Sequence, residues 1–126
     1  MKDDIIAISE QECKWTSTKE YGEMRWKLLV DSTKINSSGI SVRILKLEPT
    51  CELPLHHHSP KEVYIVKKGR GLLLKSDKNK KLKKGDLVFI PENSIHGIRN
   101  TSSRPMLIYW IFPTNSWEEI KYNFIE

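Results

Sequence analysis

The chain has 126 residues, with 21 Lys and Arg against 16 Asp and Glu, so its formal net charge is +5. Its 38% hydrophobic and 29% charged residues, with six Gly and six Pro, are typical of one globular domain and exclude a disordered or fibrous chain. The longest apolar run, Met106–Phe112, is far shorter than the roughly 20 residues that cross a bilayer. We expect a single domain over residues 1–126 and no membrane partner.

Two features bear on the compartment. The apolar stretch Ile5–Ile8 near the N-terminus is too short for the core of a signal peptide. Cys13 and Cys51 are far apart and form no CxxC pair, so neither a redox motif nor a cysteine zinc site is predicted. A reduced, cytoplasmic protein is the simplest interpretation.

From about residue 23 to residue 113 the chain consists of short β-type runs separated by turn residues. The predicted strands are Met24–Val30, Ile40–Leu47, Glu62–Val66, Gly71–Lys75, Leu87–Ile90, Ile95–Arg99 and Met106–Phe112. In the second of them Ile40, Val42 and Ile44 alternate with other residues, which is typical of a strand with one buried face.

Helical signals occur only near the ends of the chain. Ser9 with Glu12, and Ser116 with Glu119, have the Ser-x-x-Glu spacing of a capping box. Seven or more short strands with short helical segments at the termini predict an all-β fold, either a small barrel or a double-sheet jelly roll.

All four histidines lie in two short segments. In an extended strand His56 and His58 point to one face and His57 to the other, because side chains alternate. Glu62 follows His58 by four residues, where the next strand begins. His96 comes after a strand and a turn containing Pro91, and we expect the returning strand to bring it beside the first pair.

Three imidazoles and one carboxylate that converge inside a barrel suit one divalent first-row metal: Fe(II), Mn(II), Ni(II) or Zn(II). With four protein ligands an octahedral ion keeps two positions open, which is typical of a reactive site rather than a closed structural one. A solvated His-rich loop is the alternative interpretation, and we keep it for His57 alone.

Tyr64 lies two residues after Glu62 on the same predicted strand, so it shares the face of that ligand. It is either an acid or base beside the metal or a core aromatic with one hydrogen-bond partner. Trp26 and Trp110 belong to predicted strands, and an interior lined with such rings can hold a compact organic cation by cation–π attraction while the metal takes its carboxylate.

The positive charge is concentrated in one segment. Residues 67–84 contain nine basic residues and one acidic residue, a net charge of +8, so the remaining residues carry −3. No aromatic residue for base stacking interrupts this run. We interpret the lysines as solvating a hairpin and its loop, and expect no nucleic-acid partner.

The spacing His56-x-His58-x3-Glu62-x6-Gly69, followed after fifteen residues by Gly85-x5-Pro91-x4-His96-x3-Asn100, resembles the two cupin motifs. Thr50 and Asn93 stand where glycine is usual, both at turn positions, and Asn tolerates positive φ best among other residues. The resemblance implies a small single-domain cupin, a double-stranded β-helix or jelly-roll barrel with its core at about residues 23–113. It also implies a metal held by His56, His58, Glu62 and His96.

A closer resemblance covers most of the chain. It is carried by the segments Trp15–Thr18, Arg25–Asp31, His58–Tyr64 and Tyr109–Thr114, which are similar to those of the small cupin-type dimethylsulfoniopropionate (DMSP) lyases of marine bacteria. This implies β-elimination of DMSP to dimethyl sulfide and acrylate, with Tyr64 as the base and Tyr122 as a second tyrosine near the substrate. His57 stands where such relatives have Tyr.

Two other functions stay open on the residues alone. An iron-dependent cupin oxygenase acting on a small organic acid would use the same four ligands. A non-enzymatic cupin that binds a metal and a small molecule is the other, because the fold alone does not choose a reaction. The family resemblance further implies a homodimer.

Overall fold

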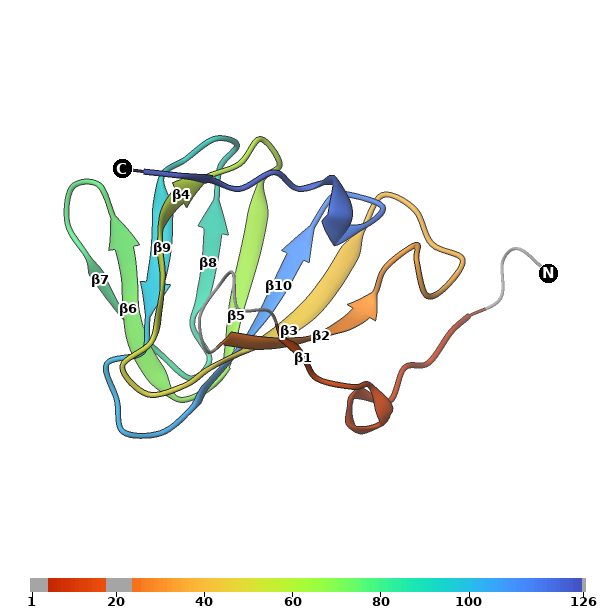
Figure 1. The fold of residues 1–126 in the computed structure, drawn as a ribbon, viewed down its shortest axis with the longest axis horizontal. Helices are drawn as coiled ribbons and strands as arrows, with labels where there is room; N and C mark the ends of the chain where they lie inside the picture. Colours follow the sequence, from red (N-terminus) through yellow and green to blue (C-terminus); the bar gives the residue numbers. More distant parts are fainter. Residues whose placement is uncertain (1–4, 18–23, 126) are drawn as a thin grey trace.

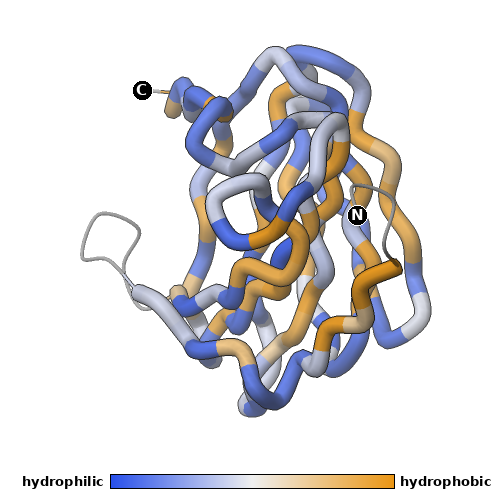
Figure 2. The backbone as a smooth tube through the Cα atoms, turned by 90° about the vertical axis from the view of Figure 1, so that its right-hand side faces the viewer, coloured by the Kyte–Doolittle hydropathy of each residue, from blue (hydrophilic) through white to orange (hydrophobic). Residues whose placement is uncertain are grey.

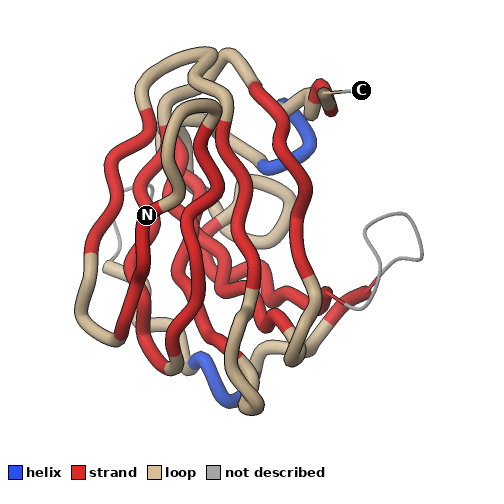
Figure 3. The backbone as a smooth tube through the Cα atoms, turned by 90° about the vertical axis from the view of Figure 1, so that its left-hand side faces the viewer, coloured by secondary structure: helices blue, strands red, loops and turns tan. Residues whose placement is uncertain are grey.

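The computed structural model describes residues 5–17 and 24–125. Residue 23, the predicted start of the barrel core, lies outside the described residues. Strands make up about half of the described residues, and Figure 3 shows them running side by side with helical turns at only two places in this part of the chain. The all-β prediction is confirmed.

Two antiparallel sheets face each other as a flattened barrel (Figure 1). The six-stranded sheet has the order β1 (Thr16–Ser17), β2 (Met24–Val30), β3 (Ser41–Leu47), β10 (Met106–Phe112), β5 (Glu62–Lys68) and β8 (Leu87–Ile90). The five-stranded sheet has the order β11 (Asn123–Phe124), β4 (Glu52–His57), β9 (His96–Arg99), β6 (Arg70–Lys75) and β7 (Lys80–Lys83).

The predicted strands are present with small shifts at their ends. Strands β2, β8 and β10 have the predicted bounds, whereas β5 extends to Lys68 and β9 begins at His96. The described residues also form four strands that were not predicted, β1, β4, β7 and β11. Strand β7 lies inside the Lys-rich run, where charged side chains on an edge strand hid the apolar signal that would have predicted it.

The interior between the sheets holds the apolar core. Inward side chains of both sheets fill it, among them Leu45, Leu53, Ile98 and Ile108, each at most 2% exposed. Figure 2 shows long apolar stretches along the strands and hydrophilic colours in most of the loops between them. Burial of these side chains stabilises the barrel by roughly 1.5–3 kcal/mol each relative to exposure.

The helical segments of the described residues are two single 3-10 turns, η1 (Glu10–Glu12) and η3 (Trp117–Glu119). The capping box predicted at Ser116 is confirmed. Its hydroxyl accepts from the backbone N–H of Glu118, and its own backbone N–H donates to the carboxylate of Glu119. The one predicted at Ser9 is wrong: its side chain makes no capping hydrogen bond. No helix in residues 5–17 and 24–125 is long and apolar enough to cross a membrane.

Two non-glycine residues adopt left-handed backbone, Thr50 with φ 66° and Asn93 with φ 61°. These are the two turn positions where the sequence departs from glycine, so the prediction that both remain turns is confirmed. Asn93 also donates its backbone N–H to the carbonyl of His58 at 2.9 Å. That bond holds the turn after β8 against the segment that carries two of the histidines.

Candidate metal centre and aromatic pocket

Three buried histidines meet inside the barrel. His56 on β4 is paired in register with His96 on β9, and their ring centroids are 4.3 Å apart. His58 follows β4, and its ring lies 5.5 Å from that of His56. These three side chains are at most 3% exposed, whereas His57 is only partly buried, as strand alternation predicts.

Glu62 joins the histidines from the other sheet. It is the first residue of β5, and its Oε1 lies 3.0 Å from Nε2 of His58 and 3.4 Å from Nε2 of His96. One ligand atom of each of His56, His58 and His96 lies within 4.8 Å of the others. We call these three residues and Glu62 the histidine cluster.

A close approach of two strands makes this arrangement possible. Gly97 follows His96, and a Cβ atom on Gly97 would lie 2.6 Å from the backbone oxygen of Leu53 on β4. A side chain at this position would therefore push β9 away from β4. Glycine lets the two strands carry His56 and His96 into contact.

Backbone carbonyls orient all three imidazoles in the same way. Nδ1 of His56 lies 2.8 Å from the Pro54 carbonyl, and the same contact is made by His58 to Pro60 and by His96 to Ser94. A carbonyl oxygen only accepts, so Nδ1 carries the hydrogen and donates it. In the neutral ring Nε2 is then left with its lone pair directed into the cluster, which is the tautomer that binds a metal.

The cluster contains polar atoms that the described protein does not satisfy. Nε2 of His56, Nε2 of His96 and Oε2 of Glu62 are buried without a hydrogen-bond partner. Burial, with the neighbouring His96, lowers the pKa of His56 to about 3, so its ring is neutral at pH 7. Imidazole nitrogens and a carboxylate oxygen that meet here without partners fit a divalent cation, since burying such atoms unpaired is costly.

Tyr64 lies beside the cluster on β5 and is completely buried. Its ring stacks on that of Trp110 at 5.5 Å and meets the ring of His96 at 6.0 Å. Among the residues that the structure describes, its hydroxyl has no hydrogen-bond partner. Burial and the charge of Glu62 raise the pKa of Tyr64 well above its usual value.

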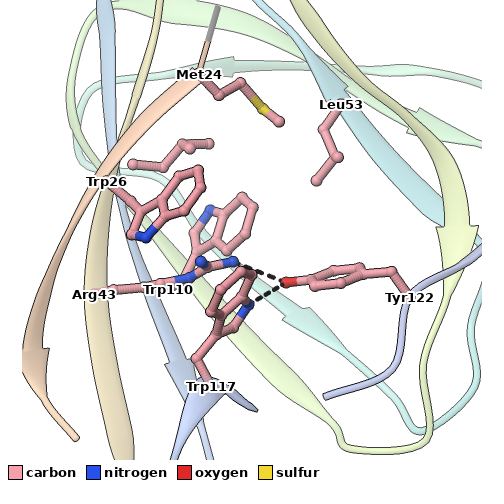
Figure 4. A pocket seen from close by; sticks show the side chains of 8 residues that line it. Met24, Trp26, Arg43, Leu53, Trp110, Trp117 and Tyr122 are labelled. Carbon is pink, nitrogen blue, oxygen red and sulfur yellow. Dashed lines mark hydrogen bonds between the residues drawn. The ribbon is translucent and has the colours of Figure 1, made fainter. Parts of the chain in front are cut away.

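Next to Tyr64 the barrel contains an aromatic pocket, which we define by Trp26, Arg43, Trp110, Trp117 and Tyr122 (Figure 4). The guanidinium carbon of Arg43 lies 4.1, 4.4 and 5.6 Å from the ring centroids of Trp117, Trp110 and Trp26. Trp26 and Trp110 were predicted to bind the cationic group of the substrate, but in the structure their rings lie around the guanidinium of Arg43.

Tyr122 connects the aromatic pocket to the histidine cluster. Its hydroxyl oxygen accepts hydrogen bonds from Nη2 of Arg43 at 2.8 Å and from Nε1 of Trp117 at 3.0 Å. Its ring lies 5.1 Å from that of His56 and 5.5 Å from that of His58. The C-terminal segment, dark blue in Figure 1, crosses one end of the barrel and brings this side chain into place.

Asp31, just after β2, fixes the start of that segment. Its Oδ2 accepts from the backbone N–H of Trp117 at 3.0 Å and from the hydroxyl of Ser116 at 3.3 Å. Burial raises the pKa of Asp31, but the hydrogen bonds from Thr33, Trp117 and Ser116 outweigh it and lower the pKa below its usual value. The carboxylate is therefore ionised at neutral pH and holds Trp117 and Tyr122 in the pocket.

Sequence reasoning missed Arg43 and took the face of β3 with Ile40, Val42 and Ile44 as its buried face. Of these three residues, only Ile44 is fully buried. Ile40 is 46% exposed and Val42 only partly buried, whereas Arg43 is 4% exposed. The register of β3 with β10 pairs Arg43 with Trp110. Apolar alternation did not reveal this, because the rings that shield the guanidinium come from β2, β10 and η3. Leu45 and Leu47, which follow Arg43 at alternate positions and are at most 1% exposed, were the signals for this inward face.

The fold is a two-sheet β-barrel, and the histidines of both cupin-like motifs point into its interior. This combination is typical of the cupin class of proteins. The chain belongs to the cupin domain family, whose match covers residues 43–112. This confirms the predicted family and jelly-roll fold.

Individual relatives agree with this assignment. An uncharacterized protein of Aquifex aeolicus is 33% identical over 68% of this chain and 70% of its own. The dimethylsulfoniopropionate lyase DddW of Ruegeria pomeroyi is 28% identical over 82% of this chain and 68% of its own. The crystal structure of the polyketide cyclase RemF from Streptomyces resistomycificus superposes with a TM-score of 0.83 at 17% identity, covering 98% of this chain and 88% of that one. The similarity to DMSP lyases is thus confirmed, whereas the cyclase shows the fold alone.

Proposed function

We propose that this cupin is a metal-dependent lyase that cleaves DMSP to dimethyl sulfide and acrylate. The observation that carries the proposal is the histidine cluster beside a buried tyrosine, in a chain similar to DddW over 82% of its length. The metal ligands would be His56, His58, Glu62 and His96, all nearly inaccessible to solvent.

The residues of the cluster fit a divalent ion, since Nε2 of His56 and His96 and Oε2 of Glu62 have no hydrogen-bond partner in residues 5–17 and 24–125. When bound there, such an ion supplies Lewis acidity toward a substrate carboxylate and a positive charge that favours a nearby phenolate. Fe(II), Mn(II), Ni(II) and Zn(II) all accept this ligand set.

Tyr64 is the proposed base. Its phenolate removes a proton from the carbon next to the carboxylate, and the C–H electron pair forms the C=C bond of acrylate. The C–S bond breaks, its electron pair stays on sulfur, and neutral dimethyl sulfide leaves. The proton on Tyr64 then passes to water, so the step needs neither oxidant nor reductant.

Burial has two effects on Tyr64: it raises the pKa of the phenol, which the charge of a bound cation would offset, and it keeps the hydroxyl away from other protein partners. Its hydroxyl has no hydrogen-bond partner within the described protein, so it is available to a substrate. Stacking on Trp110 fixes the ring. Tyr122 has a different role, because its oxygen already accepts from Arg43 and Trp117 and is held at the edge of the cluster.

The proposal is tested by incubating tag-free, metal-loaded protein with DMSP and measuring the dimethyl sulfide released into the headspace. We expect turnover by the wild type and a loss of about 10²- to 10⁴-fold in kcat for Tyr64→Phe, the range of general-base catalysis, with unchanged metal content. Tyr122→Phe is the matched variant and should retain more activity. Tyr109→Phe, on the same sheet but part-buried near Glu10, is the control.

Two results would contradict the proposal. Equal rates for Tyr64→Phe and wild type would remove Tyr64 as the base. Absence of dimethyl sulfide with every metal, together with Fe(II)-dependent oxygen consumption on a small organic acid, would identify an oxygenase instead.

A further inference from the structure

Arg43 carries a positive charge into the interior of the barrel. Its side chain is 4% exposed. Burial lowers the pKa of Arg43, while Tyr122 and Glu62 raise it, and a guanidinium stays protonated in proteins. Within the part of the chain that the structure describes, no carboxylate oxygen lies within 4.0 Å of it. The protein thus buries this cation without a counter-ion in direct contact.

Two hydrogen-bond donors at this place also lack an acceptor. Nε of Arg43 and Nε1 of Trp110 are buried without a partner among the described residues. They belong to residues that face each other across β3 and β10, with the guanidinium carbon 4.4 Å from the Trp110 ring. Leaving a buried donor unpaired is destabilising, so the pair suits a ligand that brings acceptor oxygens.

A carboxylate has the chemistry that this place lacks. It supplies the negative charge, and its oxygens accept from the planar donors of a guanidinium. The position is close to the metal ligands, because the Tyr122 ring contacts His56 and the Tyr64 ring lies between Trp110 and His96.

We propose that Arg43, together with Trp110, receives one oxygen of the substrate carboxylate, whose other oxygen stays available to the metal, and makes the site specific for small carboxylic acids. The rings of Trp26 and Trp117 hold the arginine in place and do not hold a substrate cation. For DMSP, where the inference rests on the proposed function, the sulfonium then points away from Arg43, because like charges repel. The carboxylate end is thereby fixed and the carbon next to it is presented to the base.

The test uses metal-loaded protein and isothermal titration calorimetry with propionate, which has the carboxylate of the substrate and no sulfonium. Propionamide has the same shape without the charge and serves as the control ligand. We expect propionate to bind at least about 10-fold more tightly than propionamide, the fold-change of a charge-assisted hydrogen bond.

The variants separate charge from hydrogen-bond geometry. Arg43→Met removes the charge and should weaken propionate binding at least about 10-fold, with propionamide binding and metal content unchanged. Arg43→Lys keeps the charge without the planar donors, so its affinity for propionate should lie between those of the wild type and Arg43→Met. If Arg43→Met does not fold, as shown by the absence of cooperative unfolding, Arg43→Lys alone provides the test. Arg25→Met, an exposed arginine on the neighbouring strand β2, is the matched control and should bind like the wild type.

The outcomes distinguish this inference from the lyase proposal. Wild-type affinity for propionate in both Arg43 variants would overturn the inference, even if dimethyl sulfide is formed. Arg43-dependent binding of propionate in a protein that releases no dimethyl sulfide would support it and refute only the lyase proposal. With active protein, Arg43→Lys should raise KM for DMSP more than it lowers kcat.

Discussion

The histidine cluster and the aromatic pocket lie side by side in one barrel, yet their unsatisfied atoms are of opposite kinds. The cluster offers acceptors, namely two imidazole nitrogens and a carboxylate oxygen, whereas the pocket offers the N–H donors of Arg43 and Trp110. The first arrangement suits a cation and the second an anion. The difference teaches that neighbouring parts of one barrel can be prepared for ligands of opposite charge.

The largest expected effect tests the acceptor side. His96→Ala removes a cluster nitrogen, so metal binding should fall and lyase activity should drop by about 10⁴-fold, the barrier contribution of a bound Lewis acid. Metal analysis of tag-free protein and the headspace assay measure the two effects. His57→Ala is the control, since His57 is only partly buried and lies outside the cluster; equal losses in both variants would refute the ligand assignment.

The second largest effect is the pH dependence of stability, which should differ between the histidine cluster and the aromatic pocket. In metal-free protein His56 has a pKa of about 3 against an ordinary value of 6.5. Between pH 6.5 and 3 the unfolded chain therefore binds a proton at His56 and the folded chain does not. The free energy of unfolding is unaffected by this group above pH 6.5 and decreases as the pH falls toward 3. The slope approaches about 1.4 kcal/mol per pH unit. Arg43 stays charged throughout this range and adds no slope.

Urea unfolding at several pH values between 7.5 and 4 measures this slope. His56→Asn should flatten it, while His57→Asn should leave it unchanged. A slope that is the same in wild type and His56→Asn would show that burial of this imidazole does not set the acid stability of the cluster.

A smaller effect is expected from the strand contact that builds the cluster. Gly97→Ala places a Cβ 2.6 Å from a backbone oxygen of β4, and separating these strands should cost about 1–3 kcal/mol and weaken metal binding. Gly39→Ala is the control: its Cβ meets nothing within 4 Å, and only the left-handed backbone, φ 75°, is strained. Thermal unfolding and metal titration of both variants would show whether the loss of metal is confined to Gly97→Ala.

The smallest effect concerns the C-terminal segment that supports the aromatic pocket. Ser116→Ala removes the cap of η3 and the hydroxyl bonded to Asp31, and should cost about 1 kcal/mol. Ser9→Ala should cost little, because that serine makes no capping bond. Chemical denaturation of the two variants checks the difference, and equal losses would contradict the assigned role of the cap.

Much of the fold and of the metal site could be predicted because strand geometry repeats every two residues. That period places His56 and His58 on one face with His57 on the other, and Glu62 with Tyr64 on one face of β5. The turn residues were also informative, since Thr50 and Asn93 both lie at turns, as predicted, and both adopt left-handed backbone there. Strand β7 could not be predicted, because its single buried residue, Leu82, stands among lysines.

The sequence by itself determined the all-β class, the cupin motifs and which residues can bind a metal, because these depend on side-chain chemistry and local spacing. Only the tertiary structure decided that Arg43 points inward, that three tryptophans surround it, and that Tyr122 links it to His56. A buried charge becomes tolerable through rings and hydroxyls that are distant in the chain. That compensation depends on the register between strands, which the alternation within a single strand does not specify.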